Sequence, residues 1–402
     1  MNDLRSVIKA GAVFTGDEEI NEPCYILVEQ GLIKDIILVR NSALPEGRLI
    51  DLSDLYVLPG LIDCHVHLFM EGIFDMPERG RRWKETREIT LLRAAENLER
   101  TIKSGVTTVR DLGCPPQMTA VLAEAIKKKI VLAPDLLRAG QAISITGGHF
   151  YYSGNYQADG AEEVRKAVRV LCREKVQVIK LMLTGCVNFV LQNAGAVEFT
   201  QEEIVTAVEE AHRLGRKAAV HVNGKEGVKL ALDSGADTIE HGALLDDDII
   251  DYLTEKDFYW IPTLIPFQRM YDYGVEYDYA AFPPEKVAAV YEKHYSTVRK
   301  AFAAGVKIAV GTDAGSLGVL HGDVLSEIKL LKQYGGLKPK EALQAATKWA
   351  AEALGVEESR GTLAIGKKAD IIGVKKNPLA DLDSLKEIAF VYHSGEILYS
   401  RD

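Results

Sequence analysis

"VLPGLIDCHVHLFM", residues 57–70, joins an apolar run to two histidines, His65 and His67, that are separated by one residue. In a β-strand, residues i and i+2 point to the same side of the sheet, so both imidazoles face one point at the end of a buried strand. Imidazole is an ordinary ligand of zinc and similar divalent ions. The stretch therefore predicts a metal site, with a pair of surface histidines at a strand end as the alternative.

Seven further apolar runs follow, and each ends in polar residues or glycine. Helix-like segments separate the runs, as at residues 87–105 and 200–215, where Thr200 and Glu203 have the spacing of a capping box. Eight buried strands that alternate with helices are the signature of a (β/α)8 barrel, an α/β fold. The runs are residues 60–68, 106–113, 136–144, 176–185, 217–223, 236–242, 258–264 and 306–315.

Both ends of the chain have a different pattern, in which short apolar runs alternate with glycines and charged pairs, as in β-hairpins. Each end is too short to bury a core of its own. We therefore predict that residues 1–56 and 360–402 meet to form a small β-sandwich domain, beside a barrel formed by residues 57–359.

Composition narrows the class of protein. The formal net charge of −10 argues against nucleic acid or an anionic membrane as a partner, because both attract basic surfaces. No run approaches the ~20 apolar residues that span a bilayer, and the N-terminal residues lack the apolar core of a signal peptide. The five cysteines are scattered and form no CxxC pair. We expect a cytoplasmic protein without disulfides.

Polar residues occupy the ends of the predicted barrel strands, where such barrels carry their chemistry. A lysine is unusual among polar residues at these strand ends, because an ammonium is a poor metal ligand and is costly to bury. Either Lys180 pairs with a buried carboxylate, or desolvation lowers its pKa so that the neutral amine takes up CO2. The resulting carbamate could bridge two metals. The residues at the strand ends are His65, His67, Lys180, His221, His241 and Asp313.

Taken together, these motifs resemble those of the amidohydrolase superfamily. Within it, the chain is most similar to the imidazolonepropionase-related branch that contains Xaa-Pro dipeptidases (prolidase-like enzymes) and ochratoxin-type amidases. The resemblance implies two zinc ions, bridged by carbamylated Lys180 and a hydroxide. It assigns His65, His67 and Asp313 to one ion, and His221 and His241 to the other. The matching motifs are "PGLIDCHVHL", "GVTTVRDLG", "SITGGH", "VIKLM", "AAVHV", "IEHG", "GTDAG" and "GTLAIGKKADIIGVKKNPL".

The resemblance also implies an activity, the hydrolysis of a C–N bond in a small amide such as a dipeptide or an N-acyl amino acid. The bridging hydroxide would attack the carbonyl carbon. Asp313 would move the proton to the leaving nitrogen, although a plain ligand or turn residue is the alternative. His149, in the "SITGGH" loop, would help to polarise the carbonyl unless it only packs the loop. We expect a small-molecule substrate and a homo-oligomer.

Several residues are further candidates for contact with the substrate. Arg110 could bind a substrate carboxylate, although it could also form a buried structural pair with Asp111. Asn223 stands where dipeptidase relatives often have tyrosine, and His321 follows the eighth strand. Aromatic and amide side chains in three loops suit an apolar pocket, or else pack the loops onto the barrel. They are Phe150, Tyr151, Tyr152, Asn188, Phe189, Trp260, Phe267, Tyr271 and Tyr273.

Three other functions remain to be weighed. A mononuclear deaminase or imidazolonepropionase proper would carry a glutamate three residues after His221, where this chain has Gly224. A cyclic-amide hydrolase, such as a hydantoinase or dihydroorotase, would use the same ligands and stays open. A non-catalytic scaffold would keep the fold without the ligands, but all six ligand positions are present here.

Overall fold

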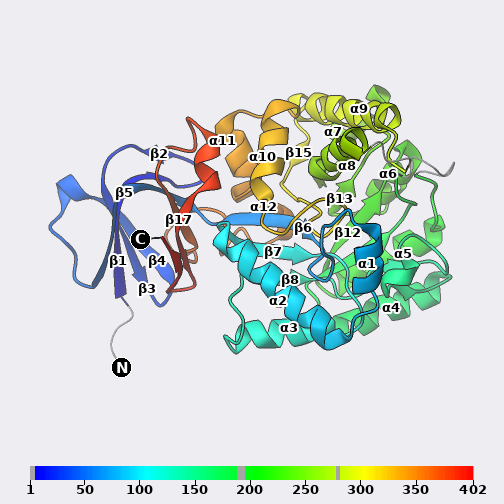
Figure 1. Cartoon of the computed structure of the whole chain (residues 1–402), viewed down its shortest axis with the longest axis horizontal. Helices are drawn as coiled ribbons and strands as arrows, with labels where there is room; N and C mark the ends of the chain where they lie inside the picture. The colour runs from blue at the N-terminus through cyan, green and yellow to red at the C-terminus, as the bar shows by residue number, and fades with distance from the viewer. Residues whose placement is uncertain (1–4, 188–194, 278–280, 402) are drawn as a thin grey trace.

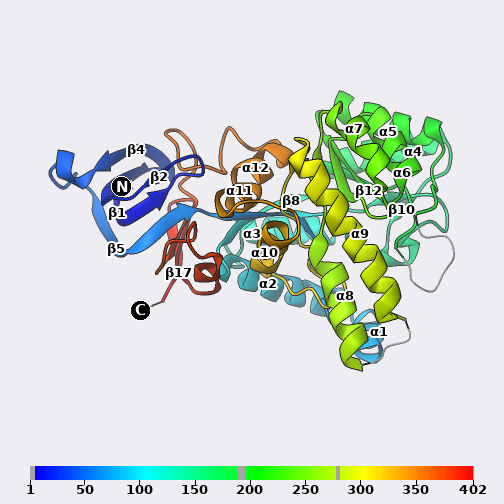
Figure 2. The ribbon, with the colours of Figure 1, turned by 90° about the horizontal axis from the view of Figure 1, so that it is seen from above.

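The computed structural model describes residues 5–187, 195–277 and 281–401. It has a barrel of parallel strands with a β-sheet from both chain ends beside it, which confirms the predicted fold (Figures 1 and 2). Each barrel strand falls within or overlaps one of the predicted runs. The barrel strands are β6 (Leu61–Val66), β7 (Val106–Asp111), β8 (Asp135–Arg138), β11 (Val178–Met182), β12 (Lys217–Val222), β13 (Thr238–His241), β14 (Tyr259–Ile261) and β15 (Lys307–Ile308).

The barrel closes where the segment after β15 runs alongside β6. The Asp63 carboxylate accepts hydrogen bonds from the backbone N (3.0 Å) and the hydroxyl (2.6 Å) of Thr312. The backbone N of Asp313 then donates to the carbonyl oxygen of His65 (2.8 Å). A Cβ at Gly311 would lie 2.8 Å from the Cβ of His65, so only glycine allows this approach. Closure therefore places Asp313 beside the histidine motif.

Helices surround the barrel. The helix α5 begins with the predicted capping box, in which Thr200 and Glu203 bond to each other's backbone N–H groups. Among the described residues, no helix is both long enough and apolar enough to cross a membrane. The helices are α1 (Met76–Arg82), α2 (Arg87–Lys103), α3 (Met118–Lys127), α4 (Ala161–Arg173), α5 (Gln201–Arg213), α6 (Lys225–Asp233), α7 (Ile250–Thr254), α8 (Leu264–Tyr277), α9 (Pro284–Ala303), α10 (Val324–Gln333), α11 (Pro339–Ala345) and α12 (Lys348–Leu354).

Strands from the two chain ends form one sheet, in the order β18-β17-β16-β5-β1-β3-β4, with the short β2 paired to β1. Side chains from both ends share one core, as with Ile26 and Phe390. Only Gly60 separates β5 from β6, so the sheet leads directly into the barrel (Figure 2). The exact domain limits stay a prediction. The strands are β1 (Arg5–Phe14), β2 (Glu19–Ile20), β3 (Cys24–Glu29), β4 (Leu32–Leu38), β5 (Arg48–Pro59), β16 (Ile371–Val374), β17 (Ile388–His393) and β18 (Glu396–Ser400).

A buried ion cluster joins this sheet to the barrel. His393, at the end of β17, contacts Asp370 (Nδ1 to Oδ1, 2.6 Å) and Asp135 at the start of β8 (Nε2 to Oδ1, 3.6 Å). Arg360 and Lys368 also pair with Asp135, at 2.8 and 2.6 Å. Burial alone would lower the pKa of His393, but the bonds to Asp135 and Asp370 raise it to about 9. The histidine is therefore a cation at neutral pH.

This raised pKa predicts a pH-dependent stability. Because the folded-state pKa exceeds the unfolded value, the stabilisation is complete below about pH 6.5 and is lost as pH rises through about 9. We expect His393→Gln to lower the free energy of unfolding by about 3 kcal/mol at about pH 6, and by much less at about pH 10. Urea denaturation of both proteins across this range measures the difference.

The exposed His212, whose one ion pair among the described residues is with Asp237, provides a matched control. His212→Gln should change the free energy of unfolding by less than about 1 kcal/mol. An effect of His393→Gln that stays constant across the pH range would contradict the assigned role of the cluster.

Candidate metal and active site

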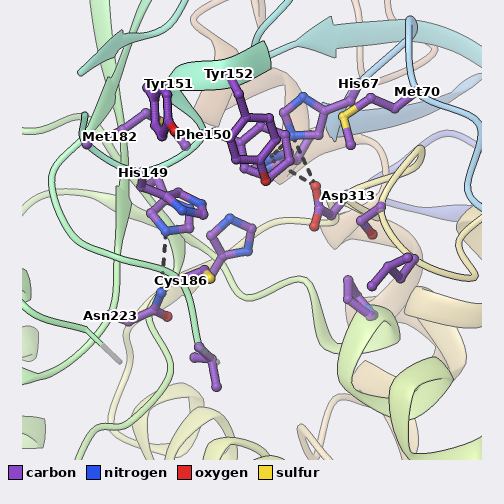
Figure 3. Close-up of a pocket in the computed structure, with 18 of the residues that line it drawn as sticks. His67, Met70, His149, Phe150, Tyr151, Tyr152, Met182, Cys186, Asn223 and Asp313 are labelled. Atoms are coloured by element: carbon purple, nitrogen blue, oxygen red, sulfur yellow. Dashed lines mark hydrogen bonds and ion pairs between the residues drawn. The ribbon is translucent and has the colours of Figure 1, made fainter. Parts of the chain in front are cut away.

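Side chains from the first and last barrel strands converge at the mouth of the barrel. His65 Nε2 lies 3.4 Å from His67 Nε2, and Asp313 Oδ1 lies 3.5 and 3.2 Å from these two nitrogens. Figure 3 shows His67 and Asp313 pointing toward each other across one side of the pocket. All three offer ligand atoms within 4.8 Å of one another, which is the spacing of a metal site.

Three more histidines extend this group across the barrel. The ring of His241 lies 4.9 Å from that of His65 and 4.6 Å from that of His221, between centroids. His149, from the loop after the short strand β9 (Ile143–Ser144), stacks on His221 at 4.5 Å. The structure thus forms a continuous row of imidazoles from the residues predicted at strands 1, 5 and 6 and in the glycine-rich loop.

A hydrogen-bonding partner holds one ring nitrogen of several of these histidines. His65 Nδ1 donates to the Glu240 carboxylate (2.7 Å), and His241 Nδ1 contacts the Thr263 hydroxyl (2.7 Å). His221 Nε2 lies 3.5 Å from the amide nitrogen of Asn223. Such partners fix the ring orientation and leave the opposite nitrogen for a metal.

Lys180 lies within the same group, on β11. Its side chain is 1% exposed, and its Nζ has no hydrogen-bond partner among the described residues. A buried ammonium with no partner is unfavourable, and such orphan groups require an explanation. Burial lowers the pKa of Lys180 to about 8, which makes the neutral amine accessible near neutral pH.

Burial also keeps the imidazoles neutral. It lowers the pKa of His241 to about 3 and that of His149 to about 4, and it lowers the pKa values of His65 and His221 well below 6.5. Burial alone would raise the pKa of Asp313, but the hydrogen bond with His67 and the nearby histidines lower it. Neutral imidazole and ionised carboxylate are the forms that bind metal. The protonation states therefore fit the geometry.

Strained backbone accompanies these side chains. His241, Thr263 and Asp313 have φ values of 66°, 47° and 56°, in the left-handed region that non-glycine residues rarely adopt. Each such residue costs on the order of 1 kcal/mol and persists only where the surrounding structure enforces it. Strain of this kind clusters at functional sites, in agreement with the converging ligands.

Arg110 lies beneath the histidines and does not line the cavity at the barrel mouth. Its guanidinium is 1% exposed and donates to the Glu240 carboxylate (2.7 Å), the Cys64 carbonyl (2.6 Å) and the Thr238 hydroxyl (3.1 Å). The structural alternative was therefore the better one, although the partner is Glu240 and not Asp111. Arg110 has no access to a substrate carboxylate.

The cavity above the histidines has a volume of about 510 Å³. Its lining includes three of the predicted site residues, Tyr152, His149 and Asn223. His321 is not part of the lining. It is buried, and its Nε2 bonds to the His67 carbonyl (3.2 Å). Asn188 and Phe189 lie outside the described residues. The other predicted aromatics in the lining are Phe150, Tyr151 and Phe267.

Asn223 is held firmly in the cavity wall. Its Oδ1 accepts a hydrogen bond from the backbone N of Ala243 (3.0 Å), and its side chain contacts His221. Figure 3 shows the resulting position of Asn223 at the far side of the pocket from His67. Asn223 therefore helps to position His221, a candidate ligand.

The lining also contains residues that the sequence analysis did not identify, among them Arg79, Trp83 and Glu198. Glu198 accepts a hydrogen bond from the backbone N of His149 (2.7 Å) and so fixes the loop that carries this histidine. Arg79 and Trp83 come from α1 and the residue after it. The sequence has no signal that separates Arg79 from its neighbours Arg81 and Arg82, since the orientation of a short helix decides which arginine points inward.

We predict that Glu240 and Arg110 are strongly coupled in their contributions to the free energy of unfolding. In Glu240→Gln the buried guanidinium loses its counter-ion, and the free energy of unfolding should fall by about 3 kcal/mol or more. The double variant Glu240→Gln/Arg110→Met removes the unpaired charge and should be more stable than the single variant. Chemical denaturation of the four proteins measures this coupling; a double variant at least as unstable as the sum of the singles contradicts it.

Comparison with known proteins agrees with this site. The amidohydrolase family model matches residues 56–398. An ochratoxinase from Aspergillus niger is 28% identical, with 96% of this chain and 85% of that protein covered. An imidazolonepropionase from Fusobacterium nucleatum subsp. nucleatum is 25% identical, with 94% and 89% covered.

The barrel and its terminal sheet are also similar to a crystal structure of a Xaa-Pro dipeptidase with methionine bound in the active site. The TM-score is 0.87 at 32% identity, with 99% of this chain and 100% of that chain covered. Members of the family generally use divalent metal ions. The chain belongs to the amidohydrolase family and is a hydrolase that acts on C–N amide bonds.

Proposed function

We propose that this protein is a binuclear metal-dependent amidohydrolase that cleaves a dipeptide or an N-acyl amino acid. The observation that carries the proposal is the buried, unpartnered Nζ of Lys180, which lines the same cavity as the candidate ligand histidines and Asp313. A carbamate at this position would turn an unfavourable buried amine into an anionic ligand.

The residues present fit two ions. His65, His67 and Asp313 would hold one, His221 and His241 would hold the other, and carbamylated Lys180 would bridge them. When bound, divalent ions such as zinc would polarise the substrate carbonyl and lower the pKa of a water molecule. Burial lowers the pKa values of His65, His221 and His241, and Glu240, Asn223 and Thr263 orient the three rings, so these side chains need little reorganisation on binding.

Asp313 would move the proton during hydrolysis. Its Oδ1 faces His65 and His67, whereas its Oδ2 has no hydrogen-bond partner among the described residues. The backbone bond to His65 and the strained φ hold the carboxylate at the cavity floor. A single positioned carboxylate can accept a proton from water and return it to the leaving nitrogen.

His149 would act on the substrate carbonyl. Its ring lies on His221 and lines the cavity, and its backbone is tied to Glu198. A neutral imidazole in this position can donate its N–H to a carbonyl oxygen. The apolar lining, which includes Met70, Phe150 and Phe267, suits an apolar side chain on the substrate. The similarity to a Xaa-Pro dipeptidase supports a dipeptide, and a cytoplasmic homo-oligomer remains part of the proposal.

Replacement of the lysine tests the bridge. We expect Lys180→Ala to lose bound metal and activity together, because the carbamate is the shared ligand. Short carboxylic acids such as acetate or propionate should restore part of both. Elemental analysis and an amide-hydrolysis assay measure the two quantities, with exposed Lys166→Ala as the control. Full activity in Lys180→Ala would refute the bridging role.

Replacement of the aspartate separates binding from catalysis. Asp313→Asn should retain much of the metal but reduce kcat by about 10²- to 10⁴-fold, since the amide side chain cannot accept the proton. Metal content and steady-state kinetics of the same preparation decide between the roles. A kcat within about tenfold of the wild type would leave Asp313 as a ligand only.

A substrate panel tests the proposed function directly. The wild-type protein, supplied with zinc, is assayed with dipeptides, N-acyl amino acids and cyclic amides. Cleavage of the first two classes is the expected result. Opening of cyclic amides alone would keep the two-metal chemistry and reject the dipeptidase-like function.

A further inference from the structure

Arg79 is a buried cation in the wall of the proposed active-site cavity. It lies on α1, which follows β6 and precedes α2 in the chain. Arg79 is 7% exposed. It lines the same cavity of about 510 Å³ as His67, His149 and Asp313. Besides Lys180, it is the one lysine or arginine in the described lining.

Arg79 differs from its neighbours on the helix in having no anionic partner. Arg81 pairs with Glu78, and Arg82 pairs with both Glu78 and Glu71. Among the described residues, Arg79 makes a single hydrogen bond, from Nη1 to the carbonyl oxygen of Ile73 at 3.4 Å, and no ion pair. A guanidinium has five N–H donors, so most of its hydrogen-bonding capacity remains unused.

The surroundings of Arg79 favour a ligand over a structural role. Its Cζ lies 5.7 Å from the centroid of the Trp83 ring, which in turn lies 5.4 Å from that of Tyr152. Trp83 and Tyr152 both line the cavity beside Arg79. A cation–π contact offsets only part of the cost of burying an unpaired charge. Binding of an anion would offset the remaining cost.

The position of Arg79 relative to the catalytic residues is also suitable. Burial lowers the pKa of Arg79, while the charges of Tyr152 and Asp313 oppose this change, so the guanidinium lies within electrostatic reach of Asp313. A substrate with its amide above Asp313 can therefore present a charged group to Arg79. Lys180 is not available for this role, because it is the proposed bridging ligand and is only 1% exposed.

We propose that Arg79 binds a carboxylate of the substrate, and that the enzyme selects amides that carry a free carboxylate close to the scissile bond. The C-terminal carboxylate of a dipeptide and the carboxylate of an N-acyl amino acid both meet this requirement. The planar guanidinium pairs with such a group through two parallel hydrogen bonds, which an ammonium cannot reproduce. The inference rests on the proposed amide hydrolysis and adds the residue that selects for the substrate carboxylate.

The test uses matched substrates that differ only in the carboxylate. Glycyl-L-phenylalanine is compared with N-glycyl-2-phenylethylamine, N-acetyl-L-phenylalanine with N-acetyl-2-phenylethylamine, and L-alanyl-L-proline with alanylpyrrolidine. In the wild type, kcat/KM should be about 50-fold or more higher for the carboxylate-bearing member. In Arg79→Met this ratio should fall below about 5, and Arg79→Lys should give an intermediate ratio.

Arg81→Met is the matched control, since its side chain is 76% exposed and lies on the same helix. It should leave the ratio unchanged. A wild-type ratio near one, or a ratio that Arg79→Met does not alter, would overturn the inference while amide hydrolysis itself stands. Circular dichroism and thermal melting of each variant exclude misfolding.

A binding measurement separates this inference from the proposed function if none of the six compounds is cleaved. Calorimetric titration of the zinc-loaded protein with N-acetyl-L-phenylalanine should then show at least a tenfold weaker Kd in Arg79→Met than in the wild type. The corresponding Kd for N-acetyl-2-phenylethylamine should not depend on Arg79. Equal affinity of both proteins for the carboxylate would reject the role of Arg79.

Discussion

The buried carboxylate of Glu240 is the interaction on which the centre of the barrel depends. It is fully enclosed and bonds to His65 from β6, to Arg110 from β7 and to the Thr238 hydroxyl (2.5 Å) of its own strand β13. One anion thus orients the first histidine of the site and neutralises the cation beneath it. Without it, the barrel interior would contain an unpaired charge directly below the proposed metal ligands.

The rest of the site follows from the way the barrel ends. Parallel strands deliver their last residues to one face, and closure through Asp63 and Thr312 places Asp313 next to the histidines. The left-handed backbone at His241, Thr263 and Asp313 turns each chain segment sharply at this point. A rigid barrel can hold such strained residues in place, and the same rigidity keeps the histidines in their binding geometry before any ion is present.

The sequence predicted the barrel and the terminal sheet because strand periodicity and helix caps are local signals. It also indicated which residues the barrel mouth brings together, since each follows an apolar run. The sequence did not indicate what a side chain contacts where its partner is distant in the chain or where the orientation of a helix determines the contact. Arg110, a candidate for binding a substrate carboxylate, is instead paired with Glu240, which lies 130 residues away in the sequence. Trp260, a candidate for the pocket, is buried in β14 and donates to the His241 carbonyl (2.8 Å). Arg79 is distinguishable from Arg81 only once α1 is oriented.

The central claim is that the residues at the barrel mouth form a two-metal centre for amide hydrolysis. The most direct test is a stoichiometric titration, in which chelator-treated wild-type protein receives zinc in small steps while hydrolysis of a dipeptide is followed. Activity should rise with added zinc and reach its maximum at about two ions per chain, as six ligands shared between two ions require. Full activity at one ion per chain, or activity that survives complete removal of metal, would contradict the account.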